Sequence, residues 1–174
     1  MIANRYEPLE LAPAGAPVKA RDTQTAQTVM LRPIIRVDER LAGLFHPAVV
    51  TIFDVVRDGA VTFASCEFVH GRSLRLIMGG QPFNGRRASE IVAEIADAVA
   101  ELHGRGICHG AITIDTVLLT TKGKAKLDLV HATDSTEAAD VDQLRGLLSE
   151  LVGHGEPDLV EVGSAALLAA RLRA

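Results

Sequence analysis

The chain is organised around the stretch His109-Gly110-Ala111-Ile112-Thr113-Ile114-Asp115-Thr116-Val117-Leu118-Leu119. Before it, apolar residues recur at the i, i+4, i+7 and i+11 spacing of a long amphipathic helix, from Ile91 to Leu102, and the pattern stops at glycines 104 and 106. Its own last three residues form an apolar run that predicts a short strand. The stretch is therefore predicted to be a loop that joins a long helix to a strand.

Three further elements are predicted on the C-terminal side of this loop. Positions 126–130 predict a second short strand, separated from the first by a Lys-Gly-Lys turn. Positions 140–152 predict a helix with one apolar face, in which Asp140 is the expected N-cap and Gln143 completes a capping box. Positions 158–173 predict a last helix.

The N-terminal half has the pattern of an antiparallel meander. Its segments are rich in apolar and β-branched residues, and turn residues separate them. The predicted strands are 6–11, 17–20, 28–35, 49–56 and 60–69, followed by a short helix at 73–78. Strands followed by helices predict an α+β architecture.

The composition excludes several classes of function. A length of 174 residues fits one domain or one domain of two small lobes, and a net charge of −4 gives no reason to expect a nucleic-acid partner. Cys66 and Cys108 form no C-x-x-C pair, so neither a disulfide framework nor a zinc site is expected. No apolar run approaches the roughly 20 residues of a membrane span, and no secretion signal begins the chain. A cytoplasmic protein, or the cytosolic domain of a longer one, is expected.

Several motifs occur in a definite order. Positions 6–22 end in Ala-Arg-Asp, and Val29-Met30-Leu31-Arg32 and His46-Pro47-Ala48-Val49-Val50 follow. Together with the loop at 109–116, these segments resemble the Gly-rich hairpin, the V-A-I-K strand, the H-P-N-I-V motif and the H-R-D-x-K-P-x-N catalytic loop of bacterial Hanks-type Ser/Thr protein kinases. The resemblance covers roughly residues 5–152. It implies a bilobal kinase-like fold, with a small antiparallel β N-lobe at 1–70 and a truncated, mainly helical C-lobe at 71–174.

The resemblance assigns catalytic roles that the residues of this chain cannot perform. In the family, the loop Asp accepts the proton of the substrate hydroxyl and the loop Asn holds a metal ion. The Asp, Lys and Asn positions hold Ala111, Thr113 and Thr116 here. A methyl group cannot accept a proton, and a lone Thr hydroxyl is a poor ligand for magnesium. The Asp of the metal-binding D-F-G is Leu129 in an ungapped register, or Asp128 after a one-residue deletion.

The parts that would hold nucleotide also depart from the family pattern. Positions 12–17 replace the Gly-rich loop with one glycine and two prolines, which lack backbone donors. Arg32 replaces the phosphate-binding Lys, and arginine differs in reach and geometry. The segment between Arg32 and His46 is too short for the regulatory helix. Cys66, Glu67 and Val69 match the gatekeeper and the hinge, whose backbone could hold adenine without a metal. No cofactor is expected.

Two matched residues are expected to serve the scaffold. The resemblance implies that His109 packs in the core. It also implies that Asp140 accepts hydrogen bonds from the loop backbone, so Asp140 is predicted to cap its own helix and to brace the chain near His109 and Gly110.

These features predict a catalytically inactive pseudokinase, similar to actinobacterial pseudokinase domains, that acts as a regulatory or scaffolding interaction domain. The alternative is a nucleotide-binding sensor that needs no metal. A third hypothesis is nucleotidyl transfer on a metal held by Asp128, Asp115 or Asp134.

The same analogy suggests the partners. A forkhead-associated domain or an active kinase is expected, with Thr133 and Thr136 as candidate phosphoacceptors in a polar stretch too short for an activation loop. A homo-oligomer is the alternative, and the apolar residues of the last segment are either its interface or core: Leu159, Val160, Val162, Leu167 and Leu168. Neither nucleic acid nor membrane insertion is expected.

Overall fold

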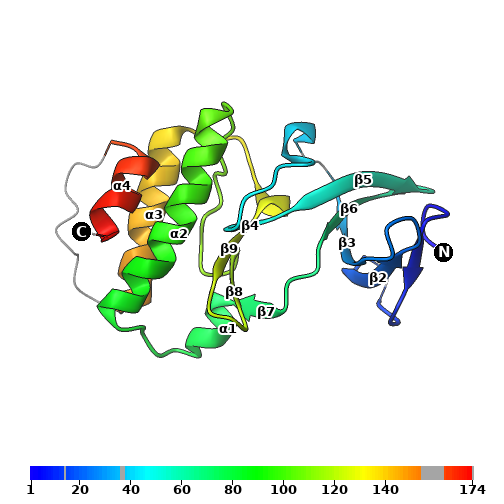
Figure 1. The fold of residues 1–174 in the computed structure, drawn as a ribbon, viewed down its shortest axis with the longest axis horizontal. Helices are drawn as coiled ribbons and strands as arrows, with labels where there is room; N and C mark the ends of the chain where they lie inside the picture. The colour runs from blue at the N-terminus through cyan, green and yellow to red at the C-terminus, as the bar shows by residue number, and fades with distance from the viewer. Residues whose placement is uncertain (14, 36–37, 154–162, 174) are drawn as a thin grey trace. The chain divides into compact units, whose positions relative to one another are not determined.

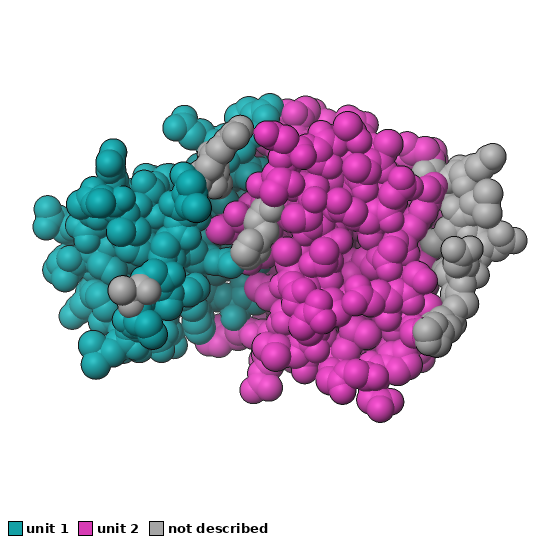
Figure 2. All heavy atoms as spheres, turned by 180° about the vertical axis from the view of Figure 1, so that it is seen from behind, with its two compact units in different colours: residues 1–46, 50–69 teal, residues 47–49, 70–174 magenta. Residues whose placement is uncertain are grey.

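The computed structural model describes residues 1–13, 15–35, 38–153 and 163–173. These residues fall into two compact units, which Figure 2 colours separately. Unit 1 comprises Met1–His46 and Val50–Val69, and unit 2 comprises Pro47–Val49 and His70–Ala174. The expected α+β class is confirmed, because unit 1 is built on an antiparallel sheet and unit 2 contains the α-helices.

Unit 1 is a five-stranded antiparallel sheet with the strand order β1-β2-β3-β6-β5. Its strands are β1 (Tyr6–Pro8), β2 (Val18–Asp22), β3 (Thr28–Ile34), β5 (Ile52–Asp58) and β6 (Val61–Glu67). One face buries a cluster of Tyr6, Ala20, Val29 and Leu31. Pro33 lies in β3 beyond Leu31, the last residue that pairs with β2. Proline has no backbone N–H to donate, and the lack of that donor costs least where no strand pairs on that side.

The sequence between β3 and the next strand forms little regular structure. Its described residues contain one 3-10 turn, η1 (Glu39–Leu41), which Asp38 caps by accepting a hydrogen bond from the backbone of Arg40. The described residues of this segment contain no α-helix.

A network of ion pairs links the start of β1 to β2 and β5 in unit 1. The guanidinium of Arg5 donates two hydrogen bonds to Asp22, at 2.9 and 2.7 Å, and one to Asp54 at 2.8 Å. The Asp22 side chain is almost fully buried, and it also accepts from the backbone of Gln24 and the hydroxyl of Thr25. The hydrogen bonds from Arg5 hold the pKa of Asp22 well below its ordinary value.

Acid is therefore expected to destabilise unit 1 through Asp22. A carboxyl group whose pKa is depressed in the folded state stabilises the fold above its unfolded pKa of about 3.9, and that contribution is lost as the pH falls toward the folded value. Tyr6 is the only tyrosine and there is no tryptophan, so tyrosine fluorescence monitors unit 1 alone. Urea unfolding followed in this way should show a smaller loss of stability between pH 7 and pH 3 in Asp22→Asn than in the wild type. An equal loss in both proteins would contradict the assignment.

Unit 2 contains three α-helices that lie side by side, and the first of them, α2 (Gly85–Gly104), is the one that packs against a small sheet (Figure 1). The other two are α3 (Glu137–Val152) and α4 (Ala165–Arg173), and a short α1 (Leu74–Met78) precedes all three. The sheet has the order β4-β9-β8-β7, from β4 (Val49–Val50), β9 (Ala125–Asp128), β8 (Val117–Thr120) and β7 (Gly71–Ser73). The apolar stripe predicted for the long helix is buried, including Ile91, Ile95, Ala98 and Leu102.

Two predicted boundaries in unit 2 are wrong. The helix expected from Asp140 begins at Glu137, because the hydroxyl of Thr136 accepts from the backbone of Ala139 and makes Thr136 the N-cap. The strand expected to run to Val130 ends at Asp128, since the Asp128 carboxylate accepts from the Val130 backbone and starts a 3-10 turn, η2 (Leu129–His131).

The last predicted helix is present in part as α4. Its first residues, together with Leu159, Val160 and Val162, lie outside the described residues. Leu168 is fully buried and Leu167 is 62% exposed. Within the described residues, no helix has the length and apolar character that crossing a membrane requires.

Candidate functional site

The candidate site is the loop at 109–116, which lies in unit 2 between the end of α2 and the start of β8. Within the loop, His109 is fully buried, Ala111 is partly buried and Thr113 is exposed. The helix α3 supplies the side chains that fix its backbone.

Asp140 is the main anchor of the loop. Its carboxylate is fully buried and accepts from the backbone N–H of His109 at 2.8 Å and of Gly110 at 2.7 Å. It also bonds Nε2 of His103 at 2.8 Å. The carboxylate therefore braces the loop, as expected, although it does not cap its own helix.

Gln143 is a second anchor that the sequence did not reveal. One turn along α3 from Asp140, its amide oxygen accepts from the backbone of Ile112 at 2.8 Å, and its amide nitrogen donates to the carbonyl of Gly110 at 3.0 Å. Its spacing from Asp140 suggested a capping box, but both side chains point to a loop about 30 residues earlier in the chain. The sequence signal for this second anchor was the i, i+3 spacing of Asp140 and Gln143, which places both side chains on one face of the helix.

His109 serves as a structural bridge within the core. Its Nε2 lies 3.0 Å from the carbonyl oxygen of Asp128, and its Nδ1 lies 3.2 Å from the backbone N–H of Ala111. A carbonyl can only accept and a backbone N–H can only donate, so these two contacts assign the neutral tautomer with the proton on Nε2. In this arrangement the ring ties the loop to the end of β9.

Thr116 closes the loop on itself. Its hydroxyl donates to the carbonyl of Ala111 at 2.6 Å and accepts from the backbone of Thr113 at 2.9 Å. Thr116 is 7% exposed, and the Ala111 side chain is a methyl group. The hydroxyl thus forms its hydrogen bonds with the backbone of its own loop.

Gly110 has a conformation and surroundings that only glycine fits. Its φ is +74°, and a Cβ there would lie 2.5 Å from Oγ1 of Thr133 and 2.8 Å from Cβ of Ser135. The segment after η2 therefore packs where a side chain at position 110 would stand. A backbone bond from Thr133 N–H to the His109 carbonyl, at 2.7 Å, fixes it there.

The carboxylates near the loop have structural partners. Asp128 is 4% exposed and caps η2, and the neighbouring Leu129 is fully buried. Asp115 forms a two-point ion pair with Arg75, which holds the pKa of Asp115 below its ordinary value. Asp134 is exposed.

Four residues match nucleotide-binding positions of the kinases, and all four lie in unit 1. Arg32 is partly buried in β3, paired in register with Ala64. Cys66 is fully buried in β6, and the backbone N–H of Glu67 donates to the carbonyl of Thr51 at 2.8 Å. Val69 follows β6 and is partly buried.

The two candidate phosphoacceptors differ in their surroundings. Both Thr133 and Thr136 are exposed. The Thr133 side chain lies against Gly110, whereas the Thr136 hydroxyl caps α3.

An α+β fold whose loop is braced by an aspartate from the following helix is compatible with a protein kinase, and the sequence comparisons point to the same class. No family model matches the chain. The probable serine/threonine-protein kinase pknA2 of Bifidobacterium longum is 26% identical over 121 residues, 69% of this chain and 16% of that protein. The serine/threonine-protein kinase PkaB of Streptomyces coelicolor is 34% identical over 90 residues, and PrkC of Bacillus subtilis is 26% identical over 98 residues.

The chain is thus similar to bacterial Ser/Thr protein kinases over about half of its length, which supports kinase-family membership. The matches with PkaB and PrkC cover 50% and 56% of this chain. The chain spans only a small part of these relatives, 22% of PkaB and 15% of PrkC.

Proposed function

We propose that this chain is a catalytically inactive, kinase-like domain that acts by binding another protein. The observation that carries the proposal is the closed loop at 109–116. The position of the family's catalytic base holds Ala111, and the Thr116 hydroxyl is bonded to the Ala111 carbonyl at 2.6 Å, within its own loop. A neutral hydroxyl that already donates to one backbone group of its loop and accepts from another is a poor ligand for a metal ion.

The carboxylates of the loop region add support. Phosphoryl transfer requires a base near the substrate hydroxyl and carboxylate or amide ligands for magnesium. Asp140 accepts from two backbone groups and His103, Asp115 pairs with Arg75, and Asp128 caps a turn. Each of these three side chains therefore has a structural task within the loop region.

The kind of partner follows from the same analogy. We propose a forkhead-associated domain that recognises a phosphorylated Thr133 or Thr136, or the active kinase that phosphorylates them. Both threonines are exposed, so a kinase can reach them. A phosphate on Thr136 would stand at the N-terminus of α3, where helix polarity favours negative charge, although Glu137 is adjacent.

The purified chain is expected to transfer no phosphate. With labelled ATP and magnesium or manganese, neither autophosphorylation nor labelling of a general kinase substrate should exceed the protein-free blank, because no base is present at Ala111. Asp128→Ala serves as the matched control and should give the same blank. Metal-dependent labelling in the wild type that disappears in Asp128→Ala would overturn the proposal in favour of an unorthodox enzyme.

Nucleotide binding separates the proposed interaction domain from the sensor. A ligand present at 100 times its Kd stabilises a protein by about 2.7 kcal/mol, which raises Tm by roughly 5–10 °C for a chain of this size. We expect ATP to leave Tm unchanged, with or without magnesium. A rise of several degrees without magnesium would identify the sensor instead.

A further inference from the structure

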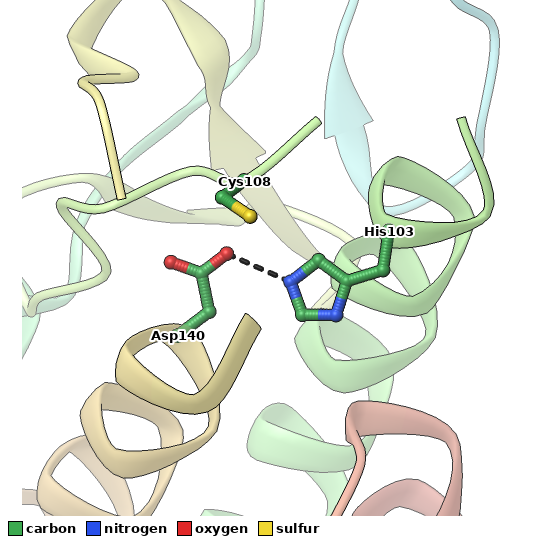
Figure 3. Close-up of side chains that lie close together, drawn as sticks. All are labelled: His103, Cys108 and Asp140. Atoms are coloured by element: carbon green, nitrogen blue, oxygen red, sulfur yellow. Dashed lines mark hydrogen bonds and ion pairs between the residues drawn. The ribbon is translucent and has the colours of Figure 1, made fainter. Parts of the chain in front are cut away.

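Three side chains that can bind metals converge beneath the loop (Figure 3). His103 comes from the last turn of α2, Cys108 precedes the loop, and Asp140 comes from the first turns of α3. One ligand atom from each lies within 4.8 Å of the others, and His103 Nε2 is 2.8 Å from Asp140 Oδ2. All three belong to unit 2.

The hydrogen bonds of Asp140 leave room for a metal ion in one arrangement. Oδ1 accepts from the Gly110 backbone, while Oδ2 accepts from the His109 backbone and faces His103 Nε2. Each carboxylate oxygen has two lone pairs. A metal ion between Oδ2 and Nε2 would replace the bond to the imidazole and keep both bonds to the loop backbone.

The burial of the cluster suits a bound ion. Asp140 is fully buried and the His103 side chain is 9% exposed, whereas Cys108 is partly exposed and gives access from solvent.

We propose that His103 Nε2, Cys108 Sγ and Asp140 Oδ2 bind one Zn²⁺ ion. Thiolate and imidazole ligands select zinc over magnesium or calcium, which prefer oxygen. Three protein ligands leave a fourth tetrahedral position for water or a donor from a partner. The thiolate and the carboxylate together balance the charge of the ion.

Binding has a definite proton balance. The Cys108 thiol loses its proton to solvent as the sulfur–zinc bond forms. The imidazole of His103 binds the ion through an unprotonated Nε2, so a proton on Nε2 passes to solvent and the ring keeps its proton on Nδ1. No oxidant or reductant is needed.

This site was not expected from the sequence. The two cysteines have no metal-binding spacing, and the third ligand lies 32 positions beyond Cys108 on another helix. No metal site was expected from the sequence, and Cys66, the other cysteine, lies in unit 1.

The test is a titration of the metal-free protein with Co²⁺, followed by competition with Zn²⁺ against a chromophoric chelator. Cobalt bound to a thiolate absorbs in the near ultraviolet by charge transfer, so the band identifies a cysteine ligand. We expect the band to saturate at one equivalent and Zn²⁺ to displace the cobalt. Cys108→Ser should abolish the band and weaken Zn²⁺ binding by at least about tenfold, since losing even an outer-shell partner costs that much.

Two further variants test whether binding depends on the three proposed ligands. Cys66→Ala retains all three proposed ligands and should bind as the wild type does. His103→Gln offers Asp140 an amide donor in place of the imidazole and should weaken binding while keeping that hydrogen bond. No cobalt–thiolate band in the wild type would overturn the proposal, as would unchanged zinc affinity in Cys108→Ser.

A measurement on the wild type makes the test independent of folding in the variants. Bound Zn²⁺ should slow alkylation of the partly exposed Cys108 thiol, identified by peptide mass, at least tenfold, and addition of a chelator should restore the original rate. Alkylation of Cys108 at the same rate with and without Zn²⁺ would contradict the site.

Discussion

Asp140→Ala is expected to lower the free energy of unfolding by about 3–5 kcal/mol, because it leaves one buried and one partly buried backbone donor, and one imidazole, without their acceptor. The donors are the N–H groups of His109 and Gly110, at 2.8 and 2.7 Å from the carboxylate. The side chain does not cap α3, so the loss falls on the loop and not on the start of the helix. Urea unfolding followed by far-ultraviolet circular dichroism measures the change.

Asp142→Ala is the matched control for this variant. It removes a carboxylate from the same helix, but the Asp142 side chain is 71% exposed and forms a local ion pair with Arg145. Its effect should stay within about 0.5 kcal/mol. Hydrogen exchange adds a local readout, since the amides of His109 and Gly110 should lose protection in Asp140→Ala alone. Equal stability of the two variants would show that Asp140 does not anchor the loop.

Gly110→Ala is expected to destabilise unit 2 by about 2–5 kcal/mol. A left-handed conformation costs a residue with a Cβ about 1–2 kcal/mol, and overpacking adds about 1–3 kcal/mol. The new methyl group would meet Thr133 and Ser135 at 2.5 and 2.8 Å. Denaturant unfolding by circular dichroism gives the change for the helices, and the fluorescence of Tyr6 monitors unit 1 in the same samples.

Gly146→Ala should act in the opposite direction. Gly146 lies on the exposed face of α3, where an added Cβ meets no atom within 4 Å. Replacing glycine by alanine in a helix interior stabilises by about 0.5–1 kcal/mol. If both glycine variants were more stable than the wild type, the packing of positions 133–135 against Gly110 would be wrong.

The sequence predicted those features that depend on local pattern. The buried stripe of α2 follows from apolar residues that recur every three or four positions, and the strands of unit 1 follow from alternating and β-branched runs. The resemblance to a kinase loop correctly predicted that Asp140 would accept from the backbone at His109 and Gly110.

The features that the sequence missed depend on contacts between distant residues. Thr136 and Asp140 are both good N-caps, and the choice between them is made by the loop at position 109, which occupies the Asp140 carboxylate. Gln143 has the spacing of a capping box, yet its amide reaches Ile112 and Gly110. No local pattern distinguishes these alternatives, because the choice depends on which segment of the chain α3 packs against.

The filled space beside Gly110 limits which side chains position 110 can carry. The kinase loops that this loop resembles have the form H-R-D, with an arginine at the position of Gly110. Here Thr133 and Ser135 occupy the place where the first atom of that side chain would stand. An arginine at position 110 would thus lower stability unless the segment at 133–135 moved, so the packing of that segment keeps this loop different from the H-R-D form.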